Sequence, residues 1–456
     1  MIAGDSNAIA SSGKNAGAVS MKVVNELVGK RETEPGKATF ETTIDGDDPH
    51  RTTELVGAAR IRATELLLEA MPADTEDPAD WPAWQSLLPR IESLAMRSDP
   101  QADDTDSIML FTGAGLFLLD QGAANRSIDY LQRALDCCHR TLGADHPTTL
   151  AVLDNLGQAC LSVGDADRAI PLMELAVAGS IRVLGDDDPG TLICRNNLSH
   201  AYHAAGDLRQ AISLSEAVLA DRERVLGADD PLTLTSRNNL AGFYQAADEP
   251  GRAIVLLEQA VADHERLLGP DHPHTLATRD NLAVCYQNAG HVSGALLHSE
   301  RTLADHERVL GRDHPDTLTS RNNLAFAYQE AGDPERAIRL LEQNLADTER
   351  ALGPDHPRTP NARNNLGGAL QLAGQVSRAI PHFVRALADR DRILGPDHPD
   401  TLVSCNSLAH GYMAAGDNDG LARVISRMLA HSIRVNGKRH PVTRALRDFL
   451  ESRPDA

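Results

Sequence analysis

The chain has 456 residues, a formal net charge of −21 at pH 7 and an aromatic content of only 3%. A charge of this sign repels phosphate backbones and anionic lipid headgroups, so it argues against nucleic-acid and membrane partners and favours a protein or peptide. Scarce aromatic side chains also argue against stacking platforms for single-stranded nucleic acid. The six cysteines form no Cys-x-x-Cys motif, which predicts reduced thiols and a cytoplasmic location.

The first part of the chain shows no repeat. Residues 1–48 are rich in Gly, Ser, Asn, Thr and Asp, and this composition predicts a largely disordered N-terminal segment. Residues 49–102 are expected to form a helical lead-in, with one helix over 52–71 and a second over 81–96. There is no signal peptide and no stretch of 18 apolar residues, so no membrane span is expected.

From residue 103 onward the sequence repeats every 42 residues without insertion or deletion. Each repeat carries a glycine, a proline four residues later and a threonine two residues after the proline. The glycines are Gly143, Gly185, Gly227, Gly269, Gly311, Gly353, Gly395 and Gly437. A fixed period of this size is typical of a solenoid, in which each repeat buries its apolar face by stacking on its neighbours. Such arrays mainly offer surfaces to other molecules, so the chain is not expected to be an enzyme.

Each repeat is expected to contain two helices. After Gly311, the first helix begins at Pro315 and ends before Gly332, and the second ends at Gly353, which can adopt positive φ. The sequence therefore predicts an all-α, right-handed superhelical solenoid of about eight antiparallel helix pairs. This array would span residues 103–436, followed by a C-terminal cap helix and tail over 437–456.

The residues of these helices resemble the tetratricopeptide repeat. Leu324, Ala325 and Tyr328 on the first helix, and Ala337 on the second, occupy positions of that family's pattern. The period of 42 and the phrase Leu-Gly-Pro-Asp-His-Pro-x-Thr-Leu, with Arg-Asn-Asn-Leu-Ala after it, resemble the kinesin-light-chain type of the repeat. With the Trp-Pro-Ala-Trp segment at 81–84, the chain is also similar to the C-terminal half of bacterial NB-ARC–tetratricopeptide proteins. Unlike them, it has no G-x-x-x-x-G-K-[ST] motif, so it is not expected to switch with ATP by itself.

A polar series on the expected first helices is the candidate binding site, because the resemblance implies that these helices line a concave groove. Carboxamides donate and accept hydrogen bonds at once, which suits the backbone of an extended peptide. The candidate groove residues are Asn196, His200, His203, Asn238, Gln245, Gln287, Asn322, Gln329, Asn364, Gln371, Asn406 and His410. The second asparagine of each pair, such as Asn197 or Asn365, is expected to bond adjacent repeats. The alternative is that both asparagine series are structural ties.

Two further periodic series are assigned structural roles. The histidines of Asp-His-Pro are expected to cap the following helix rather than bind a metal, because one histidine per repeat places them on the order of 10 Å apart. They are His146, His272, His314, His356, His398 and, in a variant motif, His440. Arginines precede the asparagine pairs at 195, 237, 279, 321 and 363. They could line the groove edge, but pairing with Glu216, Glu258, Glu300 or Glu342 is the expectation.

The sequence thus predicts a non-catalytic scaffold, without cofactor or metal, that binds a protein or extended peptide in the concave groove. Recurring acid pairs are interpreted as solvated helix faces, and neither Gly-x-Ser-x-Gly nor His-Glu-x-x-His occurs. The alternative function is a sensor or regulatory component of a bacterial NB-ARC-type signalling ATPase system. In that case the partner would be a separate nucleotide-binding signalling protein.

Overall fold

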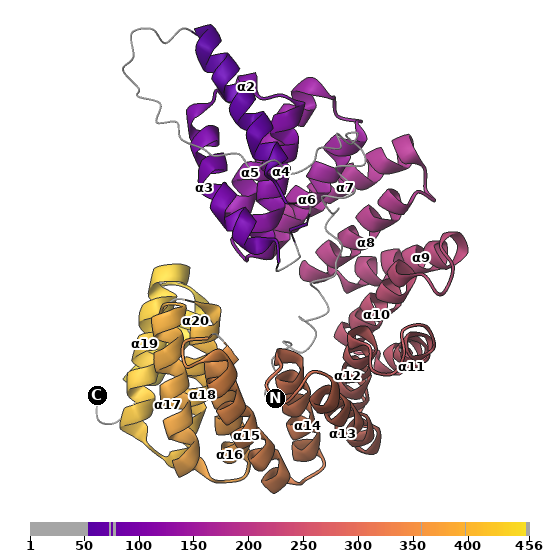
Figure 1. Ribbon diagram of the computed structural model, residues 1–456. Helices are drawn as coiled ribbons and strands as arrows, with labels where there is room; N and C mark the ends of the chain where they lie inside the picture. The colour runs from indigo at the N-terminus through magenta and orange to yellow at the C-terminus, as the bar shows by residue number, and fades with distance from the viewer. Residues whose placement is uncertain (1–52, 73, 76–78, 357, 397, 453–456) are drawn as a thin grey trace. The chain divides into compact units, whose positions relative to one another are not determined.

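The computed structural model describes residues 53–72, 74–75, 79–356, 358–396 and 398–452. The segment expected to be disordered, residues 1–48, lies outside the described residues. The described part of the chain is 82% helical, with 19 α-helices and no strand (Figure 1). This confirms the all-α helical solenoid. None of these helices is both long enough and apolar enough to cross a lipid bilayer.

The helices follow the expected order. The lead-in contains α2 (Thr53–Glu69), α3 (Trp81–Arg97) and a short 3-10 helix (Pro100–Ala102). The eight repeats then contain α4 (Thr105–Asp120) and α5 (Ala124–Thr141), α6 (Pro147–Ser162) and α7 (Ala166–Leu184), α8 (Pro189–Ala204) and α9 (Leu208–Val225), α10 (Pro231–Ala246) and α11 (Pro250–Leu267), α12 (Pro273–Asn288) and α13 (Val292–Val309), α14 (Pro315–Glu330) and α15 (Pro334–Leu352), α16 (Arg358–Leu372) and α17 (Val376–Ile393), and α18 (Pro399–Ala415) and α19 (Asn418–Asn436). The last helix is α20 (Pro441–Glu451). The division into lead-in, array and cap at residues 102/103 and 436/437 stays a prediction.

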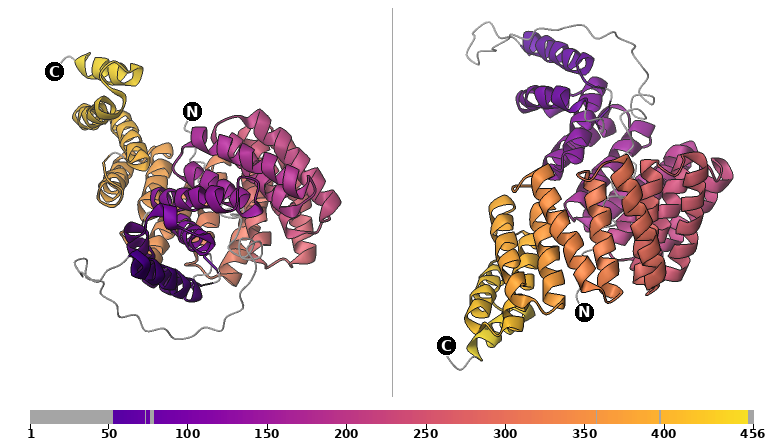
Figure 2. Two further views of the ribbon diagram at one scale, coloured as in Figure 1. Left: turned by 90° about the horizontal axis from the view of Figure 1, so that it is seen from above. Right: turned by 60° about the horizontal axis from the view of Figure 1, so that its bottom comes forward.

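The described residues form two compact units. The N-terminal unit ends at Glu249 and contains α2 to α10, and the C-terminal unit begins at Pro250 and contains α11 to α20. Within each unit, the even-numbered first helix of a repeat packs on its own odd-numbered second helix and on the second helix before it. First helices also contact one another, α6 with α8 in the N-terminal unit and α12 with α14 in the C-terminal unit. Figure 2 shows the helices of the C-terminal unit, coloured from orange to yellow, packed side by side. A single right-handed superhelix through both units stays a prediction.

The cores are built mainly from leucine and alanine, with a few aromatic anchors. In the N-terminal unit, Trp84 of α3 stacks on Phe117 of α4 with ring centroids 5.4 Å apart, which fixes the lead-in to the first repeat. In the C-terminal unit, Phe383 of α17 lies against Gly367 of α16, where an added Cβ would come within 2.7 Å of the ring. Interiors of this kind need few aromatic residues, which explains the unusual composition.

Three recurring residues hold the loop between repeats. Gly311 ends a second helix with a φ of 87°, and Pro315 begins the next first helix, where its missing N–H costs no hydrogen bond. Thr317 donates its hydroxyl to the Gly311 carbonyl oxygen over 2.7 Å. The same threonine bond is made by Thr149, Thr275, Thr359 and Thr401. These contacts explain why glycine, proline and threonine recur together.

The turn inside the fourth repeat differs from the others. Between α10 and α11, Asp248 has a φ of 60° and is the only described residue other than glycine with positive φ. Glycine occupies this turn in the sixth repeat, where Gly332 has a φ of 78°. A side chain in the left-handed region strains the backbone, although aspartate tolerates it better than most residues.

Replacing Asp248 with glycine is therefore expected to raise the free energy of unfolding by about 0.5–1 kcal/mol. The matched control is Gly332→Asp, which introduces the same strain at the same turn and should lower stability by a similar amount. Urea unfolding followed by circular dichroism measures both. The explanation fails if the two substitutions shift the midpoint in the same direction.

Candidate functional site

The structure places every candidate groove residue on a first helix. The C-terminal unit carries Gln287 on α12, Asn322 and Gln329 on α14, Asn364 and Gln371 on α16, and Asn406 and His410 on α18. The N-terminal unit carries Asn196, His200 and His203 on α8, and Asn238 and Gln245 on α10. Asn196 is buried, Asn406 and His410 are exposed, and the others are half-buried. The C-terminal unit thus carries seven of these side chains and the N-terminal unit five.

Several of these side chains have polar atoms without a hydrogen-bond partner among the described residues. In the C-terminal unit, these buried atoms are Gln329 Nε2 and Asn364 Oδ1. In the N-terminal unit, they are Asn196 Oδ1 and His200 Nε2. A buried polar atom without a partner costs about 1–3 kcal/mol. The two atoms in the C-terminal unit are one donor and one acceptor, the two functions that a peptide backbone complements.

The second asparagine of the pair ties neighbouring repeats together. Asn365 Nδ2 donates to Asn322 Oδ1 over 2.8 Å, and Asn197 Nδ2 donates to Asp154 Oδ2 over 2.7 Å. Each bond spans 43 residues, so it joins the first helices of successive repeats. This confirms the expected role of Asn197 and Asn365. It also gives Asn322 a structural partner, which supports the alternative interpretation for that one member of the groove series.

The two histidines on α8 pack around an aromatic ring of α10. Their imidazole centroids lie 5.1 Å (His200) and 4.9 Å (His203) from that of Phe243. Burial lowers the pKa of His200 to about 4 and also lowers the pKa of His203. Both rings are therefore neutral near pH 7, when an imidazole offers one donor and one acceptor.

The arginine series pairs within the chain, as expected, but with other partners. In the sixth repeat, Arg321 lies between Glu307 of α13 and Asp347 of α15, with both N–O distances 2.8 Å. Arg279 is held in the same way by Glu265 and Asp305, and Arg363 by Glu349 and Asp389. Arg237 pairs with Glu223 and Arg195 with Asp221. Arg279, Arg321 and Arg363 therefore link their first helices to the second helices on both sides.

The predicted partners of the arginines were wrong. Glu300 accepts from the Tyr328 hydroxyl over 2.5 Å, and Glu342 pairs with Arg378 at 2.7 Å. Glu216 and Glu258 accept from Tyr244 and Tyr286. The reason is the antiparallel packing of each helix pair. An arginine in the first half of a first helix lies level with the last turns of the second helices, so it meets the acids there rather than the glutamates in the middle of those helices.

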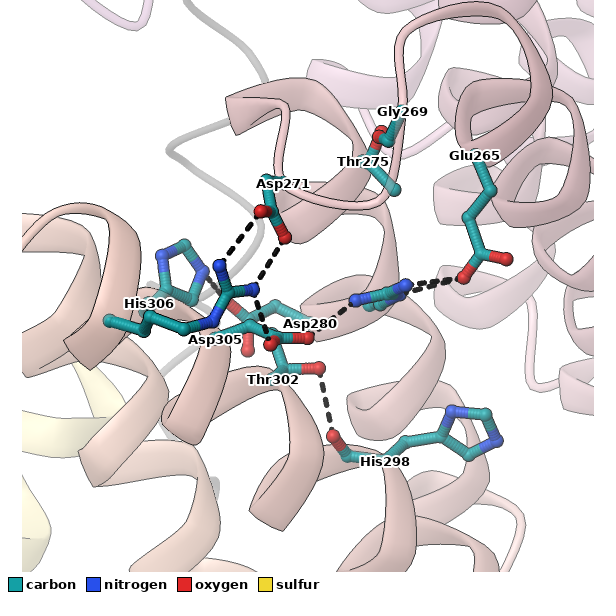
Figure 3. Close-up of polar contacts among 11 residues, drawn as sticks. Glu265, Gly269, Asp271, Thr275, Asp280, His298, Thr302, Asp305 and His306 are labelled. Carbon is teal, nitrogen blue, oxygen red and sulfur yellow. Dashed lines mark hydrogen bonds and ion pairs between the residues drawn. The ribbon is translucent and has the colours of Figure 1, made fainter.

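The fifth repeat contains a polar cluster that the sequence analysis missed. Asp280 stands where five of the repeats have the first asparagine, and its Oδ2 accepts from Ser320 Oγ over 2.5 Å. The same oxygen lies 3.1 Å from His306 Nε2. Figure 3 draws the contact between Asp280 and His306 as a dashed line. The aspartate lies between the serine and the histidine, so the imidazole cannot take the serine proton as a catalytic base would. The cluster therefore joins α12, α13 and α14.

The histidines of the Asp-His-Pro motif cap helices, as expected. His314 Nδ1 accepts from the backbone N–H of Asp316 over 3.2 Å, at the start of α14. The same bond is made by His146, His272, His356, His398 and His440. Asp188 and Asp230 replace the histidine in two repeats and cap with a carboxylate oxygen. Among the described residues, no group of three or more His, Cys, Asp or Glu could hold a metal ion.

Comparison with known sequence families identifies the repeats. A model described as tetratricopeptide repeat matches residues 106–180, 155–224, 294–347 and 322–391, and a second model with that description matches residues 233–274. Together these matches cover more than half of the chain. No curated protein sequence matches the chain at a significant level.

Three solved structures illustrate the similarity. The tetratricopeptide-like repeats of a putative kinesin light chain from Podospora anserina are 34% identical, over 45% of this chain and 97% of that one, with a TM-score of 0.42. The apo form of the quorum sensor NprR from B. thuringiensis is 13% identical, over 75% and 89% of the two chains, with a TM-score of 0.51. The signal transduction ATPase PH0952 from Pyrococcus horikoshii, which has a tetratricopeptide repeat sensor, is 13% identical over 74% and 47%, with a TM-score of 0.49.

Proposed function

Because the chain belongs to the tetratricopeptide repeat family, with repeats like those of kinesin light chains, we propose that it is a non-catalytic scaffold that binds an extended peptide segment of a partner protein. The binding surface is the carboxamide face of the C-terminal unit, formed by Gln287, Gln329, Asn364, Gln371 and Asn406. The observation that carries the proposal is the pair of unsatisfied buried atoms on this face, Gln329 Nε2 and Asn364 Oδ1.

An extended peptide is the ligand that this face suits best. Its backbone presents one N–H and one C=O per residue, so it can accept from Gln329 and donate to Asn364 without a defined sequence. The face offers little to an acidic ligand, because Arg321 and Arg363 are each already held by two carboxylates. Recognition would therefore depend on hydrogen bonds and shape, and affinity should change little with salt.

The triple substitution Gln329→Ala, Asn364→Ala and Gln371→Ala tests this proposal. A peptide selected from a random display library on the full chain should bind the triple variant at least about tenfold more weakly, since each lost hydrogen bond contributes about 0.5–1.5 kcal/mol. The melting temperature should stay nearly unchanged, because none of the three side chains makes a hydrogen bond to a described residue. Calorimetric titration and thermal unfolding provide the two readouts.

Asn365→Ala is the matched control. It removes the bond to Asn322 between α14 and α16, so it should lower the melting temperature while the folded protein retains its affinity for the peptide. The reverse pattern, with the triple variant unstable and its binding lost only on unfolding, would make the carboxamide face structural and exclude it as the site.

A further inference from the structure

The C-terminal end of the array has the opposite charge from the rest of the chain. Between Gly420 and Ser452 the sequence contains seven Arg and Lys but only two Asp and Glu, in a protein whose net charge is −21. This stretch comprises most of α19, the following turn and α20, which pack against each other at the end of the C-terminal unit (Figure 1). A strongly charged end of this kind can select a partner by charge.

Five of the seven basic residues lie on α19 or in the turn after it. Arg423, Arg427 and Arg434 are spaced by four and seven residues, so they share one face of α19. Lys438 and Arg439 follow in the turn. We call the C-terminal basic face the set Arg423, Arg427, Arg434, Lys438, Arg439 and Arg444. All are exposed except Arg427, which is half-buried and paired with Asp391 of α17.

The change of sign follows from substitutions at fixed positions of the repeat. In the sixth repeat, α15 carries Asp347 and Glu349, which pair with arginines of α14 and α16. The corresponding residues of α19 are His431 and Ile433. Where α14 buries Leu318, α20 instead exposes Arg444. The last helices have therefore exchanged two acids and a core leucine for neutral and basic side chains.

A cavity beside this face shows the same change from acidic to basic residues. It has a volume of about 540 Å³ and is lined by Arg427, His431 and Arg434 together with Leu402, Ala430 and Asp391. The equivalent place five repeats earlier, between α7, α8 and α9, holds a cavity of about 730 Å³. That cavity is lined by Asp186, Asp187, Asp188 and Asp221, with two arginines. The same position in the repeat thus presents acids in the N-terminal unit and cations beside an apolar floor in the C-terminal unit.

We propose that the C-terminal basic face is a second docking surface, which binds an acidic peptide segment of a partner protein. Charge complementarity selects Asp and Glu side chains, and Leu402 and Ala430 in the neighbouring cavity favour an apolar residue next to them. Nucleic acid fits less well, because the negative charge of the remaining chain repels a long polyanion.

The test uses the full chain and a fluorescein-labelled 12-residue peptide of alternating Glu and Leu, with a Gln-Leu peptide and a single-stranded 12-mer DNA for comparison. The triple variant Arg423→Gln, Lys438→Gln and Arg444→Gln should bind the acidic peptide about tenfold more weakly by fluorescence anisotropy, because it loses three exposed ion pairs. Binding to the unaltered chain should weaken between 50 and 300 mM NaCl, and the Gln-Leu peptide should not bind.

The control triple variant, Arg209→Gln, Arg339→Gln and Arg385→Gln, removes the same charge from exposed positions elsewhere and should stay within about twofold of the unaltered chain. If both triple variants lost the same affinity for the acidic peptide, the net charge alone would explain the binding, and the proposal would be overturned. So would failure of the acidic peptide to bind, or tighter binding of the DNA. Self-association in sedimentation that only the first variant abolishes would assign the face to a second copy instead.

Discussion

Replacing Arg321 with methionine is expected to lower the free energy of unfolding by about 3–5 kcal/mol, the range found when one partner of a buried ion pair is removed. The Arg321 side chain has no exposed surface, and that of Asp347 is 8% exposed. Methionine retains much of the volume but leaves the carboxylate without its buried cation. Urea unfolding, together with hydrogen exchange of α14 and α15, measures the loss.

Arg350→Met is the matched control, because Arg350 contacts the same Asp347 at 2.8 Å from the solvent side and its own side chain is 58% exposed. An exposed pair contributes only about 0–1 kcal/mol, so this variant should remain close to the unaltered chain. Adding Asp347→Asn to Arg321→Met should restore part of the stability, since it neutralises the stranded charge. Equal losses for the two arginines would show that burial does not set the cost.

Replacing Asp154 with asparagine is expected to stabilise the N-terminal unit at neutral and alkaline pH. Asp154 is fully buried on α6, and its Oδ2 accepts from Asn197 and Gln158, while its Oδ1 has no partner among the described residues. Burial raises the pKa of its carboxyl to about 7. The carboxyl is therefore protonated in the folded state over a range in which it is already ionised in the unfolded chain, where the pKa is about 3.9.

The sign of the pH effect follows from this difference. The folded state binds the extra proton between about pH 4 and pH 7, so the favourable contribution is complete at the acidic end and is lost as the pH rises through 7. The total loss is on the order of 2–4 kcal/mol. Asp154→Asn should abolish this slope and be the more stable protein at pH 8. The low pKa of His200 gives an opposite slope in both proteins, so the difference between their curves isolates Asp154.

Asp280→Asn controls for position and chemistry, because Asp280 occupies the same place in the fifth repeat. Its carboxylate contacts Ser320 and His306, so the substitution should weaken these bonds and lower stability at pH 8. Chemical unfolding at pH 5 and pH 8 compares all three proteins. If Asp154→Asn and Asp280→Asn both stabilised the protein at pH 8, or if neither did, the result would contradict the inference that burial destabilises the ionised carboxyl of Asp154.

The fold could be predicted because one short pattern specifies it eight times. Gly311, Pro315 and Thr317 act within a single loop. Their contacts are local, so the structure of the loop can be predicted from their spacing in the sequence. Helix capping by His314 is equally local, since the bond reaches only two residues forward. The position of the carboxamides on first helices could also be predicted, because the helical spacing of apolar residues shows which helix each residue belongs to.

The long-range partners could not be predicted. Arg321 contacts Glu307, which lies 14 residues before it, and Asp347, which lies 26 residues after it. These partners depend on which turns of neighbouring helices lie side by side. Asp154 and Asp280 share one position of the repeat but have different partners, Asn197 and Gln158 for the first and Ser320 and His306 for the second. Sequence periodicity treats such positions as equivalent, whereas their energetics depend on the residues that meet them in space.

The arginine contacts also bear on how such a gene can grow. The glutamate of one repeat serves the arginine of the next, while the aspartate comes from within the same repeat. A duplication of any 42-residue stretch therefore supplies one new arginine for the glutamate before it and one new glutamate for the arginine after it. Every buried charge finds a partner again, wherever the copied segment begins. Array length can thus change by whole repeats at little energetic cost, whereas a shorter insertion would strand a guanidinium or a carboxylate in the interior.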